Sequence, residues 1–168
     1  LLLQSLHPLA MAGVAGHSGY KGDPWGRLQR TSHFLATTTF GTVEDAEAAI
    51  ARVSDIHERV RGRDPKGRPY RAGDPHLLRW VHVAEAYSFL TAYQRFADEP
   101  ITHTEADTYV EQAAVVARLL GATEVPTTVA GLERALTAYR PDLEATDAAR
   151  DAARFLLLQP PLPLLARP

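Results

Sequence analysis

The chain contains no cysteine, so disulfide bonds, thiolate metal sites and cysteine nucleophiles are all excluded. Its formal net charge is only −2, which gives no reason to expect nucleic acid or an anionic membrane as a partner. A membrane span needs roughly 20 uninterrupted apolar residues. The most apolar stretch, at the start, is broken by Gln4, His7 and Pro8, so we expect no span. The lack of cysteine leaves the compartment open, and we take the cytoplasm as the expected location.

The sequence has enough apolar residues to build a core. It has 168 residues, of which 45% are hydrophobic and 8% aromatic, so it is long enough for one domain and is not disordered. It opens with Leu-Leu-Leu and closes on a proline-rich apolar segment after Phe155. We therefore interpret residues 1–168 as a single helical domain that is truncated at both ends.

Capping signals divide the chain into helices. Asp23-Pro24 and Asp74-Pro75 each combine an N-cap with a proline at the first helical position, and Thr42 with Asp45 forms a capping box. Glycines stop several helices. The signals predict helices over 1–16 (interrupted near Pro8), 24–40, 43–61, 75–97, 104–120, 128–139 and 146–158. Residues 62–73 are rich in turn formers and suit a loop or a short hairpin.

These patterns predict an all-α bundle of about seven helices. No segment shows the alternation of a half-buried strand. The helix over 75–97 is apolar around most of its circumference, so we expect it, and Trp80 within it, at the centre of the core.

Two histidines lie on helix faces that are otherwise apolar. His57 falls in a stripe with Ile50, Val53 and Val60, and His82 follows Trp80 on the central helix. A buried imidazole needs a hydrogen bond or a metal. Each residue can therefore be a core histidine bonded to a carbonyl or carboxylate, or part of a cofactor site.

Arg27 and Thr31 are four residues apart and share one helix face. On spacing alone they can be a capping and surface salt-bridge pair. They can equally present a cation and a hydroxyl to a pocket.

Several short motifs, taken in order, resemble the MpaB-type oxygenase family, which includes the latex clearing proteins (rubber oxygenases). The motifs are Leu3-Gln-Ser-Leu-His7-Pro8, His17-Ser18, Tyr20, Trp25, Arg27-Leu-Gln-Arg30-Thr31, Val60-Arg61-Gly62, Trp80-Val81-His82 and Leu119-Leu120-Gly121. The resemblance covers the whole chain. It implies the helical core of the latex clearing proteins and a haem b cofactor, with His57 as the proximal iron ligand.

The same resemblance gives the remaining site residues their expected roles. Arg27, Arg30 and Thr31 would polarise oxygen or anchor the haem propionates. His82 would either stand next to the pocket or be a satisfied core residue. The implied activity is a haem b-dependent oxygenase acting on an apolar small molecule with dioxygen.

Two departures weaken the link to rubber cleavage. Arg30 stands where rubber oxygenases carry a lysine that can reach the iron, and a guanidinium has no lone pair for a metal. The glutamate that serves those enzymes as base has no equivalent that we can locate in the first helix. The rival functions are a haem carrier or sensor without turnover, and a cofactor-free helical binding or structural domain.

Overall fold

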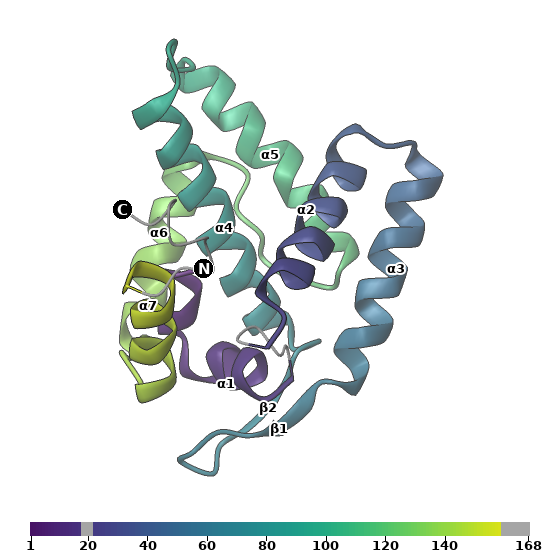
Figure 1. Ribbon diagram of the computed structural model, residues 1–168. Coiled ribbons are helices and arrows are strands. Elements are labelled where there is room, and N and C mark those ends of the chain that lie inside the picture. The colour runs from purple at the N-terminus through teal and green to yellow at the C-terminus, as the bar shows by residue number, and fades with distance from the viewer. Residues whose placement is uncertain (18–21, 159–168) are drawn as a thin grey trace.

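The computed structural model describes residues 1–17 and 22–158 (Figure 1). Helices account for 73% of these residues, and the only strands among them form one short hairpin, so the predicted all-α class is confirmed. The elements are a 3₁₀ turn at Gln4–Leu6, α1 (Pro8–His17), α2 (Pro24–Phe40), α3 (Val43–Arg59), β1 (Arg61–Arg63), β2 (Pro69–Arg71), α4 (Pro75–Phe96), α5 (His103–Leu119), α6 (Val129–Tyr139), a 3₁₀ turn at Arg140–Asp142, and α7 (Asp147–Leu158). Ser18, Tyr20 and the apolar C-terminal segment 159–168 lie outside the described residues.

The predicted N-caps are confirmed. The side chains of Asp23, Thr42 and Asp74 accept hydrogen bonds from backbone N–H groups of the first turns of α2, α3 and α4. Thr128 does the same for α6. The cap of α5 is Thr102, which forms a full capping box with Glu105, so this helix begins at His103, one residue earlier than predicted.

Two predicted helix boundaries were wrong. Residues 1–16 are not one helix, because His7 is extended (ψ 114°) and α1 begins only at Pro8, where the missing N–H does no harm. The predicted interruption near Pro8 is thus confirmed. Helix α3 ends at Arg59 rather than Arg61, since the next residues enter strand β1, which pairs antiparallel with β2.

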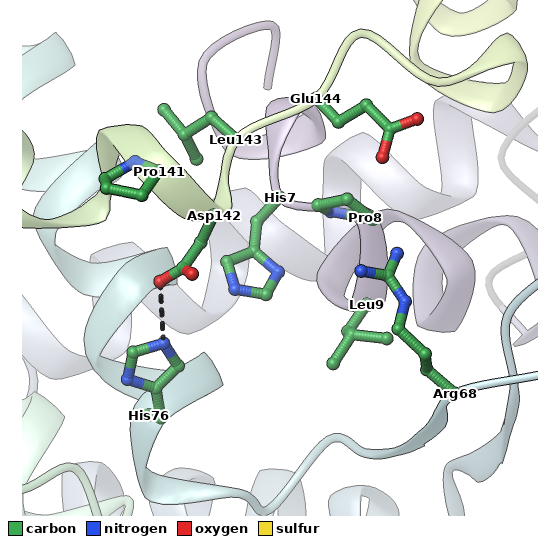
Figure 2. A pocket seen from close by; sticks show the side chains of 9 residues that line it. All are labelled: His7, Pro8, Leu9, Arg68, His76, Pro141, Asp142, Leu143 and Glu144. Carbon is green, nitrogen blue, oxygen red and sulfur yellow. Dashed lines mark ion pairs between the residues drawn. The ribbon is translucent and has the colours of Figure 1, made fainter. Parts of the chain in front are cut away.

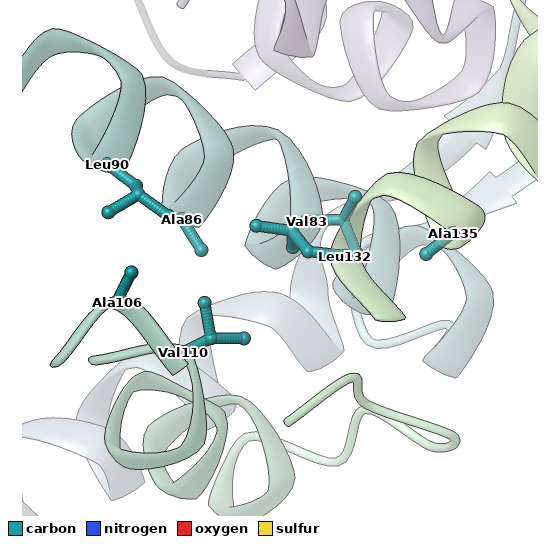
Figure 3. Packing of buried hydrophobic residues seen from close by; sticks show 7 residues of the cluster. All are labelled: Val83, Ala86, Leu90, Ala106, Val110, Leu132 and Ala135. Carbon is teal, nitrogen blue, oxygen red and sulfur yellow. The ribbon is translucent and has the colours of Figure 1, made fainter. Parts of the chain in front are cut away.

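Helix α4 forms the centre of the core, as predicted. Its buried residues Val83, Ala86 and Leu90 pack against α5 and α6, from which Ala106, Val110, Leu132 and Ala135 approach (Figure 3). Trp80 is fully buried one turn earlier on α4. Helices α1 and α7 pack together on another side of the molecule.

Helices α2 and α3 pack mainly on each other, as an antiparallel pair beside the core (Figure 1). No residue of α2 is buried, and Ile50 is the only buried residue of α3. The apolar stripe predicted on α3 is therefore covered only at its middle, with Val43 69% and Ile56 46% exposed.

Among the described residues, no helix is both long and apolar enough to cross a membrane.

Candidate functional site

The three residues predicted on α2 differ in their surroundings. Arg27 is half-buried, and burial together with the nearby Arg30 lowers the pKa of its guanidinium. Arg30 is exposed and forms an ion pair with the N-cap residue Asp23 at 3.2 Å. Thr31 is also exposed and donates its hydroxyl to the Arg27 carbonyl oxygen at 3.0 Å. Of the three side chains, only that of Arg27 is partly buried. Those of Arg30 and Thr31 are exposed and bond to other residues of the same helix or its N-cap.

His57 occupies the last turn of α3 and is half-buried. Its Nδ1 is buried and has no hydrogen-bond partner in the part of the chain that the structure describes. Burial lowers the pKa of the imidazole, so the ring is neutral at physiological pH. Because α2 and α3 are antiparallel, His57 lies at the same end of the pair as Arg27 (Figure 1). A neutral imidazole with an unsatisfied nitrogen fits a metal or haem ligand.

His82 is a second buried imidazole without a partner. Its Nε2 lies on α4, and no described residue bonds to it. Burial, and then the positive charge of Arg118 on α5, lower its pKa to about 4. The ring is therefore neutral at physiological pH and leaves one polar atom for a ligand, a water or a cofactor.

Glu85 is a further candidate residue, which the sequence analysis did not identify. It follows His82 by three positions on α4, so the two share a helix face. Burial raises the pKa of its carboxyl group. The signal in the sequence was its spacing from His82, whereas the base was expected in the first helix, over 1–16, which contains no glutamate.

Tyr109 of α5 belongs to the same region. Burial, and then the negative charge of Glu85, raise the pKa of its phenol to about 12. The shifted pKa values keep the His82 imidazole and the Tyr109 phenol neutral near pH 7, where both can form hydrogen bonds. Of the three groups, the Glu85 carboxyl, whose pKa is raised, is the one suited to exchange a proton.

A separate pocket lies at the other side of α4. It has a volume of about 360 Å³, and His7, His76, Asp142, Arg68 and Glu144 contribute its polar lining (Figure 2). His76 is exposed, as predicted for the first turn of its helix, and its Nε2 lies 3.5 Å from a carboxylate oxygen of Asp142. His7 is buried beside them, with 4% of its surface exposed.

The fold and these residues define an all-α protein in which half-buried histidines on α3 and α4 each have one buried ring nitrogen without a partner among the described residues. A comparison with protein families matches residues 1–168 to the catalytic domain described as ER-bound oxygenase mpaB/B'/Rubber oxygenase. The chain belongs to this family, as its motifs indicated. Searches of curated proteins and of solved structures found no match.

Proposed function

We propose that this protein is a haem b-dependent oxygenase that acts on an apolar small molecule with dioxygen. The family supports the oxygenase class for the whole chain. The observation that carries the haem assignment is the buried Nδ1 of His57, which lacks a hydrogen-bond partner among the described residues. An unpaired buried polar atom costs stability, and binding of a cofactor at this ring would compensate for that cost.

In this proposal His57 would hold the haem iron through its imidazole. When bound, haem supplies the activation of dioxygen, while the protein supplies the ligand, the pocket and the exclusion of water. Arg27, half-buried at the same end of the α2–α3 pair, places a cation beside the cofactor, where it can bind a propionate or a polar oxygen. Arg30 and Thr31 join it only if Arg30 leaves Asp23 and the Thr31 hydroxyl leaves the Arg27 carbonyl.

His82 and Glu85 share one face of α4, and in this proposal that face would turn toward the cofactor. His82 stays neutral because its pKa is about 4, so it can donate or accept a hydrogen bond without bringing a charge. The raised pKa of Glu85 suits it to take up and release a proton. We propose Glu85 as the carboxyl group that exchanges protons in this site.

We propose an apolar substrate because apolar side chains stay accessible beside the two main candidate residues. Leu28, next to Arg27, is 53% exposed, and Ile56, next to His57, is 46% exposed. Ligand pockets are lined mainly by apolar side chains. The cytoplasmic location stays a prediction.

The test is haem binding by matched histidine variants. Purified protein is mixed with haem, passed through a desalting column and examined for a Soret band, and the same spectrum is taken of His57→Ala, His82→Ala and His103→Ala. We expect His57→Ala to lose the band while circular dichroism stays helical. His82→Ala should retain haem, and His103→Ala, which changes an exposed residue at the start of α5, should match the parent protein.

The outcomes separate the rivals. Stoichiometric haem with an unchanged spectrum in His57→Ala would refute the ligand assignment. Retained haem without oxygen consumption on a panel of olefins would indicate a carrier or sensor. No haem binding by the parent protein would leave the cofactor-free domain.

A further inference from the structure

Three potential metal ligands from distant parts of the chain converge in the pocket of Figure 2. His7 lies between the 3₁₀ turn at Gln4–Leu6 and α1, His76 lies in the first turn of α4, and Asp142 lies in the 3₁₀ turn after α6. One ligand atom of each residue lies within 4.8 Å of the other two. We propose that His7, His76 and Asp142 bind a Zn²⁺ ion, at a site separate from the proposed haem site at His57.

His7 shows that the pocket is built rather than incidental. Only 4% of its surface is exposed, it lines the pocket, and its Nδ1 has no hydrogen-bond partner among the described residues. A buried neutral imidazole turned into a polar pocket is a ready metal ligand.

Surrounding contacts hold two of the ligands in place. The Trp80 indole donates from Nε1 to the Gln4 carbonyl oxygen at 3.0 Å, which fixes the turn immediately before His7. The Tyr139 hydroxyl donates to the His76 carbonyl oxygen at 2.8 Å, and the two rings lie in contact, tilted by 46° with centroids 4.7 Å apart. Such outer contacts orient metal ligands and are a regular part of metal sites.

The donor set selects the metal. Two imidazole nitrogens and one carboxylate oxygen suit Zn²⁺, whereas Mg²⁺ and Ca²⁺ prefer oxygen ligands throughout. Zinc–ligand distances of about 2.0–2.2 Å place tetrahedral ligand atoms about 3.3–3.5 Å apart. His76 and Asp142 already meet this spacing at 3.5 Å, and both are about half exposed, so they can close on His7.

Charge and space at the pocket agree with one bound cation. The other two charged residues of the lining have partners, since Arg68 pairs with Asp64 and Glu144 with Lys66. Asp142 instead pairs with His76, which is itself a proposed ligand. A metal ion between these two side chains would replace their direct contact. The remaining coordination position would face the pocket and take a water, as in three-ligand zinc sites.

Metal binding to matched variants tests this site. The haem-free protein is stripped with a chelator and titrated with Zn²⁺ by calorimetry, and with Co²⁺ while its visible absorption is followed. We expect one ion per chain, a Co²⁺ spectrum typical of tetrahedral coordination, a rise in melting temperature with Zn²⁺ and no response to Mg²⁺. His76→Ala and Asp142→Asn should each weaken binding at least tenfold.

Control variants distinguish this site from non-specific binding at surface residues and make the test independent of the haem proposal. His103→Ala and Asp147→Asn change an exposed histidine and an exposed aspartate outside the pocket, and should bind Zn²⁺ as the parent does. His57→Ala should also bind Zn²⁺ unchanged, whether or not it loses haem. His76 and Asp142 are exposed, so folding survives their replacement. Absence of one-to-one binding, or equal affinity in His76→Ala and Asp142→Asn, would overturn the proposal and leave a simple His76–Asp142 ion pair.

Discussion

Trp80 shows how one residue links the first turn of the chain to the core. Its side chain is fully buried, its indole N–H bonds to the Gln4 carbonyl, and its ring lies 5.1 Å from that of Tyr139. Replacement by alanine removes the apolar contacts, leaves a cavity and strips the Gln4 carbonyl of its donor. We expect Trp80→Ala to lower the free energy of unfolding by about 3–5 kcal/mol, measured by urea denaturation.

The chain offers a matched control in its other tryptophan. Trp25 lies on α2 with 51% of its surface exposed. Trp25→Ala should change the unfolding free energy by less than about 1 kcal/mol, because little of its surface is removed from water. If Trp80→Ala costs as little as Trp25→Ala, helix α4 is not the centre of the core.

Residue types alone pointed to some candidate site residues and not to others. His57 could be singled out from the sequence as a polar ring in an apolar stripe, and its Nδ1 is buried without a partner among the described residues, while its role as iron ligand stays a prediction. Arg30 could not be placed from the sequence, because its partner Asp23 lies seven residues away and a long guanidinium can reach either a pocket or a cap. His7 and Asp142 are 135 positions apart, and no local pattern brings them together (142 − 7).

At the scale of elements, the β1–β2 hairpin depends on one buried carboxylate. Asp64 accepts from the backbone N–H groups of Lys66 and Arg68, and its other oxygen lies 2.8 Å from Arg68 Nε. Burial alone would raise the pKa of Asp64, but the Arg68 guanidinium and the two N–H groups together lower it below its ordinary value. The carboxylate form therefore stabilises the hairpin.

This lowered pKa predicts a pH dependence. A carboxyl group whose folded pKa is depressed stabilises the protein fully above its unfolded pKa of about 3.9, and the contribution is lost as pH falls through the folded pKa. Asp64→Asn should thus lower the urea midpoint of unfolding at neutral pH. The difference in midpoint between the variant and the parent protein should shrink below about pH 4. Asp147→Asn, at an exposed residue, should show no such gap. If the difference in urea midpoint between Asp64→Asn and the parent protein stays constant with pH, Asp64 acts through packing and not through its charge.

Local chemistry made the starts of the helices predictable and their ends less so. A capping side chain such as Thr42 or Asp74 bonds within its own first turn, so the sequence contains both partners. The end of α3 depends instead on strand pairing. Arg61 leaves the helix because it pairs with Arg71, ten residues further on, and the Ala72 N–H bonds to the Val60 carbonyl.

At the scale of the whole molecule, the buried residues are distributed unevenly among the helices. Helices α4, α5 and α6 hold the largest buried cluster, whereas α2 buries no residue and α3 buries only Ile50. The apolar pattern of the sequence predicted that α4 is central, because it shows apolar residues around most of its circumference. The sequence could not show that the apolar stripe of α3 is only partly buried in the protein. A periodic apolar stripe has the same sequence pattern whether protein or a cofactor packs against it.

This asymmetry predicts where the protein opens first. Few buried apolar contacts mean a low free energy of local opening, so backbone amides of α2 and α3 should exchange with deuterium faster than those of α4. Hydrogen exchange followed by mass spectrometry compares peptides from the three helices in the haem-free protein. If the proposed function holds, haem will slow exchange in α2 and α3 much more than in α4, and it will fail to do so in His57→Ala. Equal protection of α2, α3 and α4 without haem would show that the two outer helices are held as firmly as the core, and would remove the argument that a cofactor completes their packing.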